Sequence, residues 1–532
     1  MPANANNVDI FIIGGGINGC GIARDAAGRG YKVALAEMND LASATSSAST
    51  KLFHGGLRYL EFLEFRLVRE ALIEREVLLR AMPHISWPMR FILPFHNEMR
   101  FENDTPTSKI LSFFLPWMKG RRPAWLIRFG LFLYDNLGGR KILPGTKTLK
   151  LHSCDEGKPL VSKFEKAFEY SDCWVEDSRL VVLNARDAYA KGATIHVQSK
   201  VISATFTTGL WHIVTRNSDG YEQTTTAKMI INAGGPWVED IIRNTVRLNS
   251  TEGVRLVRGS HIVTKKLYEH DKCYFFQGED GRIVFSIPYE DDFTLIGTTD
   301  ADHESPSIKP VCTPEETLYL IDFANKYFIN QISKDDVVWT YSGVRPLYND
   351  GASSATAATR DYVLKVNHSA GGPVLNIFGG KITTYRRLAE SALELIDAEF
   401  MRKTNKWTAK APMPGGDFPV TGLKNLCDKL GKKLPFLSEK IIKRLIRQYG
   451  TEAAIIFEGC TSLDNLGKNF GHGIFQQELD WTIENEWVTQ ADDFLWRRSK
   501  LGLRLRDEEK NEINAYIAKY ITDQRTKSLN RF

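Results

Sequence analysis

The chain has 532 residues, of which 43% are apolar and 25% are charged. This composition supplies a large buried core and so excludes a disordered or fibrous protein. The 69 basic residues exceed the 64 acidic ones by only 5, and so small an excess predicts no nucleic-acid partner.

The cysteines and the N-terminus exclude several further classes. The seven cysteines are widely spaced and form no C-x-x-C pair, so neither a metal site nor a disulfide framework is predicted. Residues 1–7 are short and polar, without the features of a targeting signal. No apolar run reaches the roughly 18 to 20 residues that span a bilayer. We therefore expect a cytoplasmic protein without a transmembrane helix.

The first predicted elements form a β-α-β unit. Asp9–Ile13 is a short apolar run that ends at three glycines, as a buried parallel strand would. Residues 17–29 have helical character and stop at Gly30, and residues 31–37 are predicted to form a second strand. Together they have the usual size of such a unit, about 30 residues.

The turn of this unit carries the pattern G-x-G-x-x-G in Gly14, Gly16 and Gly19. The glycines allow a tight turn, a close approach to a pyrophosphate and close packing of the helix, whose N-terminus attracts negative charge. Glu37 lies 18 residues after Gly19 at the end of the second strand, where an acid binds ribose hydroxyls. The motif predicts a dinucleotide site and argues against NADP, but leaves FAD and NAD open.

The remaining elements continue along the chain. An amphipathic helix is predicted over 61–82, and helical patterns recur over 384–400, 438–449 and 507–521. Strands are predicted at 194–203, 210–216, 228–233, 260–264, 283–287, 293–298 and 375–378. Residues 408–419 hold three prolines and two glycines, so they are predicted to link a C-terminal helical domain.

Residues 45–59 combine hydroxyls, a lysine, a histidine, two glycines and an arginine. Short hydroxyl side chains with free backbone N–H groups suit the phosphates and ribityl chain of a cofactor. Gly55 and Gly56 allow backbone to lie against a flat group. We interpret this segment as a second part of the cofactor site.

This segment resembles the signature of FAD-dependent glycerol-3-phosphate dehydrogenases of the aerobic, quinone-linked bacterial type. Further motifs of that family follow in its order, between residues 9 and about 420. They lie at 168–182, 232–237, 259–261, 297–300, 342–346, 359–362 and 379–384. The C-terminal part resembles the family's helical domain more loosely.

The resemblance implies an α/β fold with α+β elements. A Rossmann-like FAD-binding domain of the glutathione-reductase and D-amino-acid-oxidase type would comprise 1–90, 165–250 and 365–400. An antiparallel-sheet domain that binds substrate and caps the flavin would comprise 91–164 and 251–364. Residues 420–532 would form an α-helical C-terminal domain. The sequence does not indicate its role, for which a contact in a homodimer and a scaffold are the alternatives.

The resemblance also implies an activity. The protein would oxidise sn-glycerol 3-phosphate to dihydroxyacetone phosphate with FAD and pass the electrons to a membrane quinone. One alternative is an FAD-dependent glycerol-3-phosphate oxidase that reduces oxygen to peroxide, and another is a flavin-binding protein without catalysis. No D-x-D-x-D-G loop follows residue 408, so no calcium site is predicted there.

The implied site residues fall into three groups. The catalytic base would be His54, because histidine suits proton abstraction at neutral pH. His261 is the second candidate for the base and is otherwise expected to contact the substrate. The substrate phosphate would meet Arg345 and Arg360 together with Arg58 and Tyr59, since a guanidinium matches phosphate oxygens. Lys381 would stabilise negative charge on the reduced flavin. Cofactor-binding residues would be Gly14, Gly16, Gly19, Glu37, Thr45, Ser46, Ser47, Lys51, Leu52, Gly55, Gly56, Gly234, Gly380, Lys381 and Thr383.

A longer segment over 94–122 departs from the family. It holds the apolar run Ile110–Met118, followed by Lys119, Arg121 and Arg122. An apolar patch with an interfacial tryptophan and a basic flank is typical of docking onto an anionic leaflet. We expect this segment to seat the enzyme peripherally on the inner face of the cell membrane, with a core segment beneath a basic loop as the alternative.

Overall fold

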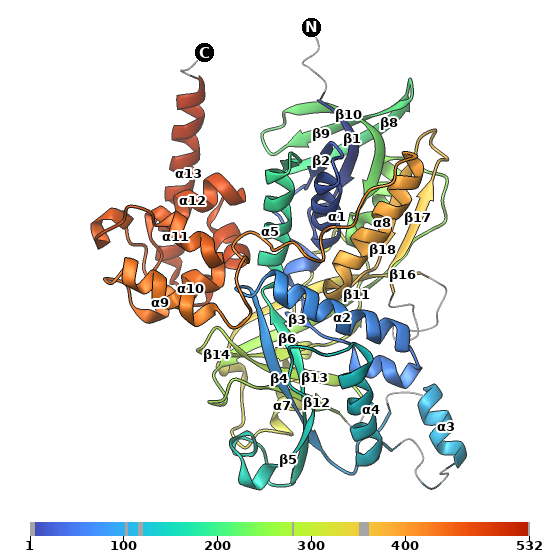
Figure 1. Cartoon of the computed structure of the whole chain (residues 1–532), viewed down its shortest axis with the longest axis vertical. Coiled ribbons are helices and arrows are strands. Elements are labelled where there is room, and N and C mark those ends of the chain that lie inside the picture. The colour runs from blue at the N-terminus through green and yellow to red at the C-terminus, as the bar shows by residue number, and fades with distance from the viewer. Residues whose placement is uncertain are drawn as a thin grey trace.

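The computed structural model describes residues 6–101, 105–114, 117, 121–278, 281–349 and 361–529. Two β-sheets and a C-terminal group of helices make up this part of the chain (Figure 1). The first sheet runs in the order β17-β18-β10-β1-β2-β7, with β9 paired to β10 and β8 to β9. Its strands are β1 (Asn6–Ile13), β2 (Val33–Ala36), β7 (Thr194–His196), β8 (Ser199–Thr207), β9 (Leu210–Asn217), β10 (Glu222–Asn232), β17 (Val363–Asn367) and β18 (Val374–Phe378).

The centre of the first sheet is parallel. β1 pairs in parallel with β2 and β10, and β10 pairs in parallel with β18. Helices α1 (Ile17–Gly28), α5 (Asp177–Ala190) and α8 (Tyr385–Glu399) pack on this sheet and share one hydrophobic core with it (Figure 1). Strands buried on both faces are expected to be apolar throughout, and β2 is buried at every position. The predicted Rossmann-like fold is confirmed.

The second sheet is almost wholly antiparallel. It runs in the order β15-β11-β14-β13-β12-β4-β6-β3, with β16 on β11 and β5 on β6. Only β4 and β12 pair in parallel among these strands of the described residues. Its strands are β3 (Leu52–Phe53), β4 (Ser86–Phe95), β5 (Lys147–Lys150), β6 (Lys166–Val175), β11 (Val254–Lys265), β12 (Cys273–Gln277), β13 (Ile283–Tyr289), β14 (Phe293–Gly297), β15 (Ala301–Asp302) and β16 (Val337–Tyr348). The antiparallel sheet implied by the sequence is therefore present.

The predicted domain boundaries do not follow the two sheets at several strands. β3 and β6 lie within the predicted cofactor domain but belong to the second sheet, and β4 and β17 each cross a predicted boundary. Residues 166–175 were assigned to the cofactor domain, but β6 pairs with β4 over its whole length in the second sheet. All of β6 except Lys166 is buried, so its sequence shows no alternation that would identify the sheet it joins. The boundaries themselves stay a prediction.

The helical patterns after the linker are confirmed. Helices α9 (Leu423–Lys433), α10 (Glu439–Tyr449), α11 (Ala453–Ile456), α12 (Gln476–Glu486) and α13 (Asp507–Leu529) pack around two small cores of their own. Two buried ion pairs join this group to the rest of the molecule, Arg498 with Asp40 and Glu486 with Arg179, both at 2.5 Å. Figure 1 shows the group against one side of the two sheets.

Five further helices complete the set among the described residues: α2 (Phe65–Ala81), α3 (Pro106–Phe114), α4 (Ala124–Leu137), the short α6 (Val238–Asp240) and α7 (Pro314–Asn325). α2 confirms the amphipathic helix predicted over 61–82. In the part of the chain that the structure describes, none of the helices is long and apolar enough to cross a membrane.

Candidate functional site

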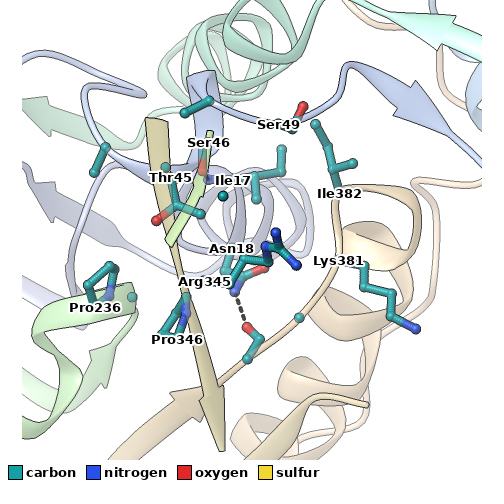
Figure 2. A pocket seen from close by; sticks show the side chains of 18 of the residues that line it. Ile17, Asn18, Thr45, Ser46, Ser49, Pro236, Arg345, Pro346, Lys381 and Ile382 are labelled. Carbon is teal, nitrogen blue, oxygen red and sulfur yellow. Dashed lines mark hydrogen bonds between the residues drawn. The ribbon is translucent and has the colours of Figure 1, made fainter. Parts of the chain in front are cut away.

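A cavity of about 550 Å³ lies where the two sheets meet. The turn after β1, the segment after β2, the ends of β10 and β18, and strands β11 and β16 all contribute residues to its lining (Figure 2). Carboxyl ends of parallel strands are where ligands bind in doubly wound sheets. The cavity is therefore the candidate site.

The glycine turn has the geometry of a pyrophosphate cradle. Gly14 has φ +110°, and a Cβ there would lie 2.5 Å from the Ala233 carbonyl oxygen. A Cβ at Gly19 would lie 2.0 Å from the Gly14 carbonyl oxygen, so this glycine lets α1 pack against the turn. Gly16 precedes α1 and provides no side-chain cap. The first turn of α1 thus presents backbone amides and its positive dipole end to an anion.

Glu37 lies at the end of β2 and lines the cavity. Its carboxylate accepts hydrogen bonds from the backbone N–H of Gly15 at 2.6 Å and of Asn39 at 2.9 Å. Burial is the largest influence on this carboxyl, and it raises the pKa of Glu37. An acid held here by the glycine turn can accept hydrogen bonds from ribose hydroxyls, so the cradle and Glu37 together fit an adenine dinucleotide.

Most of the predicted site residues line the cavity. They are Gly14, Gly16, Glu37, Thr45, Ser46, His54, Gly56, Arg58, Tyr59, Gly234, His261, Arg345, Gly380 and Lys381. Ser46 accepts a hydrogen bond from the Ile17 backbone N–H at 3.0 Å, which ties the hydroxyl-rich segment to the helix N-terminus. Arg360 lies outside the described residues.

Six predicted cofactor residues do not line the cavity: Gly19, Ser47, Lys51, Leu52, Gly55 and Thr383. Lys51 is fully buried and forms an ion pair with Asp177 at 2.9 Å. A Cβ at Gly55 would lie 2.4 Å from Leu72 Cδ2, so this glycine serves packing. Thr383 accepts a hydrogen bond from the His54 backbone N–H at 3.3 Å. These residues support the lining rather than form it.

The two histidines differ in their hydrogen bonds. His54 Nδ1 accepts from the Gly56 backbone N–H at 3.1 Å, so the neutral ring carries its proton on Nε2. Burial and then the nearby cation Lys381 lower the pKa of His54 to about 4. Because its acceptor nitrogen is already hydrogen-bonded, His54 is a weak proton acceptor.

His261 lies on β11 and stacks on Tyr341 of β16, with 4.7 Å between ring centroids. Its Nε2 pairs with Thr50 Oγ1 at 3.0 Å. Among the described residues, no hydrogen-bond partner reaches its buried Nδ1. Burial and the charges of Lys51 and Arg345 hold its pKa well below the usual value. A neutral His261 that donates from Nε2 to Thr50 keeps a lone pair on Nδ1.

Arg345 provides a partly exposed cation in the cavity. Its guanidinium forms an ion pair with Asp300 at 2.7 Å and donates to the Thr299 carbonyl oxygen at 3.2 Å. A Cβ at Gly259 would lie 2.4 Å from Arg345 Nη2, so this glycine makes room for the guanidinium. Arg345 is two-fifths exposed, which leaves part of the fork open to an anion.

Lys381 follows the two glycines at the end of β18. Its ammonium lies 4.0 Å from the centroid of the Tyr59 ring, a cation–π contact. The Gly379 carbonyl oxygen accepts from Asn18 Nδ2 at 3.1 Å, the bond dashed in Figure 2. This bond connects the glycine turn after β18 to the first turn of α1.

Two acids that were not predicted as site residues, Asp172 and Asp300, hold the cations of this site. Asp172 is buried in the lining of the cavity. It forms an ion pair with Arg75 at 2.5 Å and accepts from the Tyr134 hydroxyl at 2.8 Å. Asp300 pairs with Arg345. Both acids lie in motifs that the resemblance identified, but their partners are distant in sequence and only the fold brings them together.

Two family models match the chain. Residues 9–386 match the model described as FAD dependent oxidoreductase, and residues 406–527 match the C-terminal domain of alpha-glycerophosphate oxidase. The first covers both sheets and the cavity, and the second covers the C-terminal helices.

Similar proteins extend over nearly the whole chain. D-Erythritol 1-phosphate dehydrogenase of Brucella abortus (strain 2308) is 46% identical over 509 residues, which cover 96% of this chain and 97% of that protein. Glycerol-3-phosphate dehydrogenase of Pseudomonas tolaasii is also 46% identical, over 97% of this chain and 96% of that protein. The aerobic glycerol-3-phosphate dehydrogenase of Escherichia coli (strain K12) is 42% identical, over 97% and 98%.

A solved structure has the same fold. The glycerol-3-phosphate dehydrogenase from Bacillus halodurans complexed with FAD superposes with a TM-score of 0.70 at 24% identity, over 96% of this chain and 94% of that one. The dinucleotide cradle, the family models and the full-length relatives agree. This chain belongs to the FAD-dependent oxidoreductase family and carries the C-terminal domain of alpha-glycerophosphate oxidase.

Proposed function

We propose that this enzyme oxidises sn-glycerol 3-phosphate to dihydroxyacetone phosphate and that a membrane quinone is the final electron acceptor. The observation that carries the proposal is the pairing of a neutral histidine, His261, with a partly open cation, Arg345, in the cavity that also holds the dinucleotide cradle. The names of the relatives support the same substrate.

FAD, when bound, supplies the acceptor for the hydride from the alcohol carbon. The chain's own residues have two tasks. Arg345 binds and orients the phosphate, which fixes the position of the alcohol carbon. His261 takes the hydroxyl proton on Nδ1 while Nε2 donates to Thr50.

Binding of the substrate phosphate is also expected to raise the pKa of His261. Burial is the largest cause of the low pKa of His261 in the free site, and the charges of Lys51 and Arg345 lower it further. A phosphate dianion on Arg345 offsets that positive charge, so the pKa of His261 rises on binding and the ring becomes a better base. We therefore propose His261 as the base in preference to His54, whose acceptor nitrogen is bonded to Gly56.

D-Erythritol 1-phosphate is the second candidate substrate, because a dehydrogenase of that name is as similar to this chain as a glycerol-3-phosphate dehydrogenase is. The two compounds share a phosphate and a neighbouring alcohol and differ in chain length. We expect kcat/KM to be highest for glycerol 3-phosphate, lower for D-erythritol 1-phosphate and undetectable for glycerol. A higher kcat/KM for D-erythritol 1-phosphate would assign the enzyme to that substrate. A kcat/KM for glycerol equal to that for glycerol 3-phosphate would show that the enzyme does not recognise the phosphate.

Substitution of Arg345 tests the phosphate site. Arg345→Met removes a charge-assisted hydrogen-bond donor, which contributes about 1.5 to 3 kcal/mol. We expect KM for glycerol 3-phosphate to rise roughly 10- to 150-fold with a smaller change in kcat. Arg255→Met is the matched control, because Arg255 of β11 also pairs with an aspartate, Asp302 of β15, but does not line the cavity. Equal effects of the two substitutions would contradict the assignment.

An exposed apolar patch, which we call the α3–α4 patch, supports the proposed membrane association. Association with the membrane would in turn bring the enzyme to a membrane quinone as electron acceptor. The members of the patch are Ile110, Phe113, Phe114, Trp117, Trp125, Phe129 and Phe132, each at least half exposed. Exposed cations lie beside them at Lys109, Arg121 and Arg128. Figure 1 shows α3 and α4 at the edge of the molecule away from the C-terminal helices. Clustered aromatic side chains with a basic rim suit an anionic lipid surface.

One of the three cations expected to face lipid lies elsewhere. Arg122 is buried and pairs with Glu61 and with Gln277 Oε1, the latter at 2.7 Å. Its neighbour Arg121 is exposed, and Lys119 lies outside the described residues. The carboxylate of Glu61, on the 3₁₀ turn Leu57–Phe62, pairs with Arg122 inside the protein. The sequence around Arg122 does not reveal this distant partner.

Acidic substitutions in the α3–α4 patch test membrane docking. Phe113→Glu with Phe129→Glu removes two aromatic side chains from a lipid contact and adds repulsion, so we expect vesicle affinity to fall about 100-fold. Co-sedimentation with anionic vesicles measures it, and activity with a soluble acceptor stays unchanged. Ile329→Glu with Ile455→Glu is the control, since both are exposed elsewhere. Undiminished vesicle binding by the patch variant would refute this role.

A further inference from the structure

None of the described residues of the C-terminal helical domain lines the cavity, yet aromatic contacts connect this domain to the cavity. Trp496 stacks on Trp339 of β16 with 4.6 Å between ring centroids and 18° between planes. Trp339 lies 5.0 Å from Tyr341, and Tyr341 stacks on His261 at 4.7 Å and 9°. A continuous row of four rings thus joins the C-terminal domain to the histidine of the site.

Strand pairing fixes the inner part of this row. Trp339 and Tyr341 are two residues apart on β16 and therefore point to the same face of the sheet. Tyr341 lies opposite His261 on β11, and Trp339 lies opposite Val263. The Tyr341 hydroxyl donates to the Ser49 carbonyl oxygen at 2.8 Å. Its ring also lies 5.1 Å from the Lys51 ammonium.

The outer ring is held by its own segment. A Cβ at Gly502 would lie 2.7 Å from the Trp496 ring, so this ring lies directly on the Gly502 backbone. Lys500 donates to the Trp496 carbonyl oxygen and to Ser178 Oγ, the latter at 3.1 Å. Leu503 packs on the hydrophobic core of the second sheet. The segment from Trp496 to Leu503 is therefore fixed to both other parts of the molecule.

We propose that the C-terminal domain positions the His261 ring through the row Trp496–Trp339–Tyr341–His261, with Trp496 as a positioning residue for the reaction. His261 has little freedom on its other side, because a Cβ at Gly297 would lie 2.1 Å from its Cδ2. A shift of Tyr341 moves the His261 ring relative to the alcohol. Because interiors are close-packed, loss of the outer ring is transmitted along the row.

The kinetic test rests on the proposed function and uses the holoenzyme in anaerobic stopped-flow reduction by glycerol 3-phosphate. We expect Trp496→Ala to lower the limiting rate about 10- to 100-fold and to change the substrate dissociation constant by less than about threefold. Trp496→Phe keeps a ring in the row and restores most of the rate. Gly502→Ala keeps the Trp496 ring but displaces it, so we expect the limiting rate to fall in this variant as well.

Trp481→Ala is the matched control, because Trp481 is a tryptophan of the same domain that contacts Arg186 of α5, with 4.6 Å from Arg186 Cζ to the ring centroid. It takes no part in the row. A wild-type rate in Trp496→Ala, or an equal loss in Trp481→Ala, would overturn the inference.

A second measurement does not depend on the substrate. In holoenzyme labelled with ¹³C-histidine, the ring signal of His261 is assigned by its loss in His261→Gln. Trp496→Ala shifts this signal, Trp496→Phe returns it toward its original position, and Trp481→Ala leaves it in place. An unmoved His261 signal in Trp496→Ala would overturn the inference, whatever the substrate of the enzyme. Failure of glycerol 3-phosphate to reduce the wild-type enzyme would instead count against the proposed function alone.

Discussion

His261→Gln is expected to lower the limiting rate of anaerobic flavin reduction by glycerol 3-phosphate roughly 10²- to 10⁴-fold, the range that a positioned general base contributes. Glutamine can keep a hydrogen bond to Thr50 Oγ1, which His261 contacts at 3.0 Å, but it cannot accept the proton. FAD content should stay at the wild-type level, since no proposed FAD contact is lost. Stopped-flow absorbance gives the rate directly.

His54→Gln is the comparison, because His54 lines the same cavity and its Nδ1 already accepts from Gly56. We expect its rate to fall by less than about 10-fold, well below the range for loss of a base. A large loss in His54→Gln with a small loss in His261→Gln would reverse the two roles.

Asp177→Asn is expected to destabilise the protein by about 3 to 5 kcal/mol, because it leaves the Lys51 ammonium buried without a counter-charge. Both side chains of this pair are fully buried, and the Lys51 Nζ lies 2.9 Å from each carboxylate oxygen. The carboxylate also accepts from Ser49 Oγ at 2.8 Å and from the Ser178 backbone N–H at 2.8 Å. The apparent midpoint of urea unfolding, followed by far-UV circular dichroism, reports the change.

Two variants separate the buried charge from other effects. Asp155→Asn breaks an exposed pair with Lys158, whose side chains are 77% and 78% exposed, so its midpoint should match the wild type. The double variant Lys51→Met, Asp177→Asn removes the uncompensated charge and should be more stable than Asp177→Asn alone. A double variant as unstable as the single one would show that the ion pair is not the cause.

Local patterns predicted the parts of the site that depend on short stretches of chain. The glycine turn and Glu37 were identified because their spacing follows from one β-α-β unit, and the structure places both in the cavity. Strands and helices with clear periodicity, such as α2 and α10, were also predicted from the sequence alone.

Contacts between distant segments could not be predicted in this way. Lys51 lies in a hydroxyl-rich segment that suggested a phosphate ligand, but it pairs with an aspartate 126 positions away. Gly55 suggested a flat ligand and instead makes room for Leu72. The stacking of Trp496 on Trp339 joins two domains, and neither tryptophan is marked by any local pattern.

Anaerobic titration of the FAD holoenzyme with glycerol 3-phosphate is the most direct test of the central claim. The account predicts that the flavin absorbance near 450 nm bleaches with one equivalent of substrate and that dihydroxyacetone phosphate appears in equal amount. An unchanged spectrum in a holoenzyme that dithionite still bleaches would contradict it.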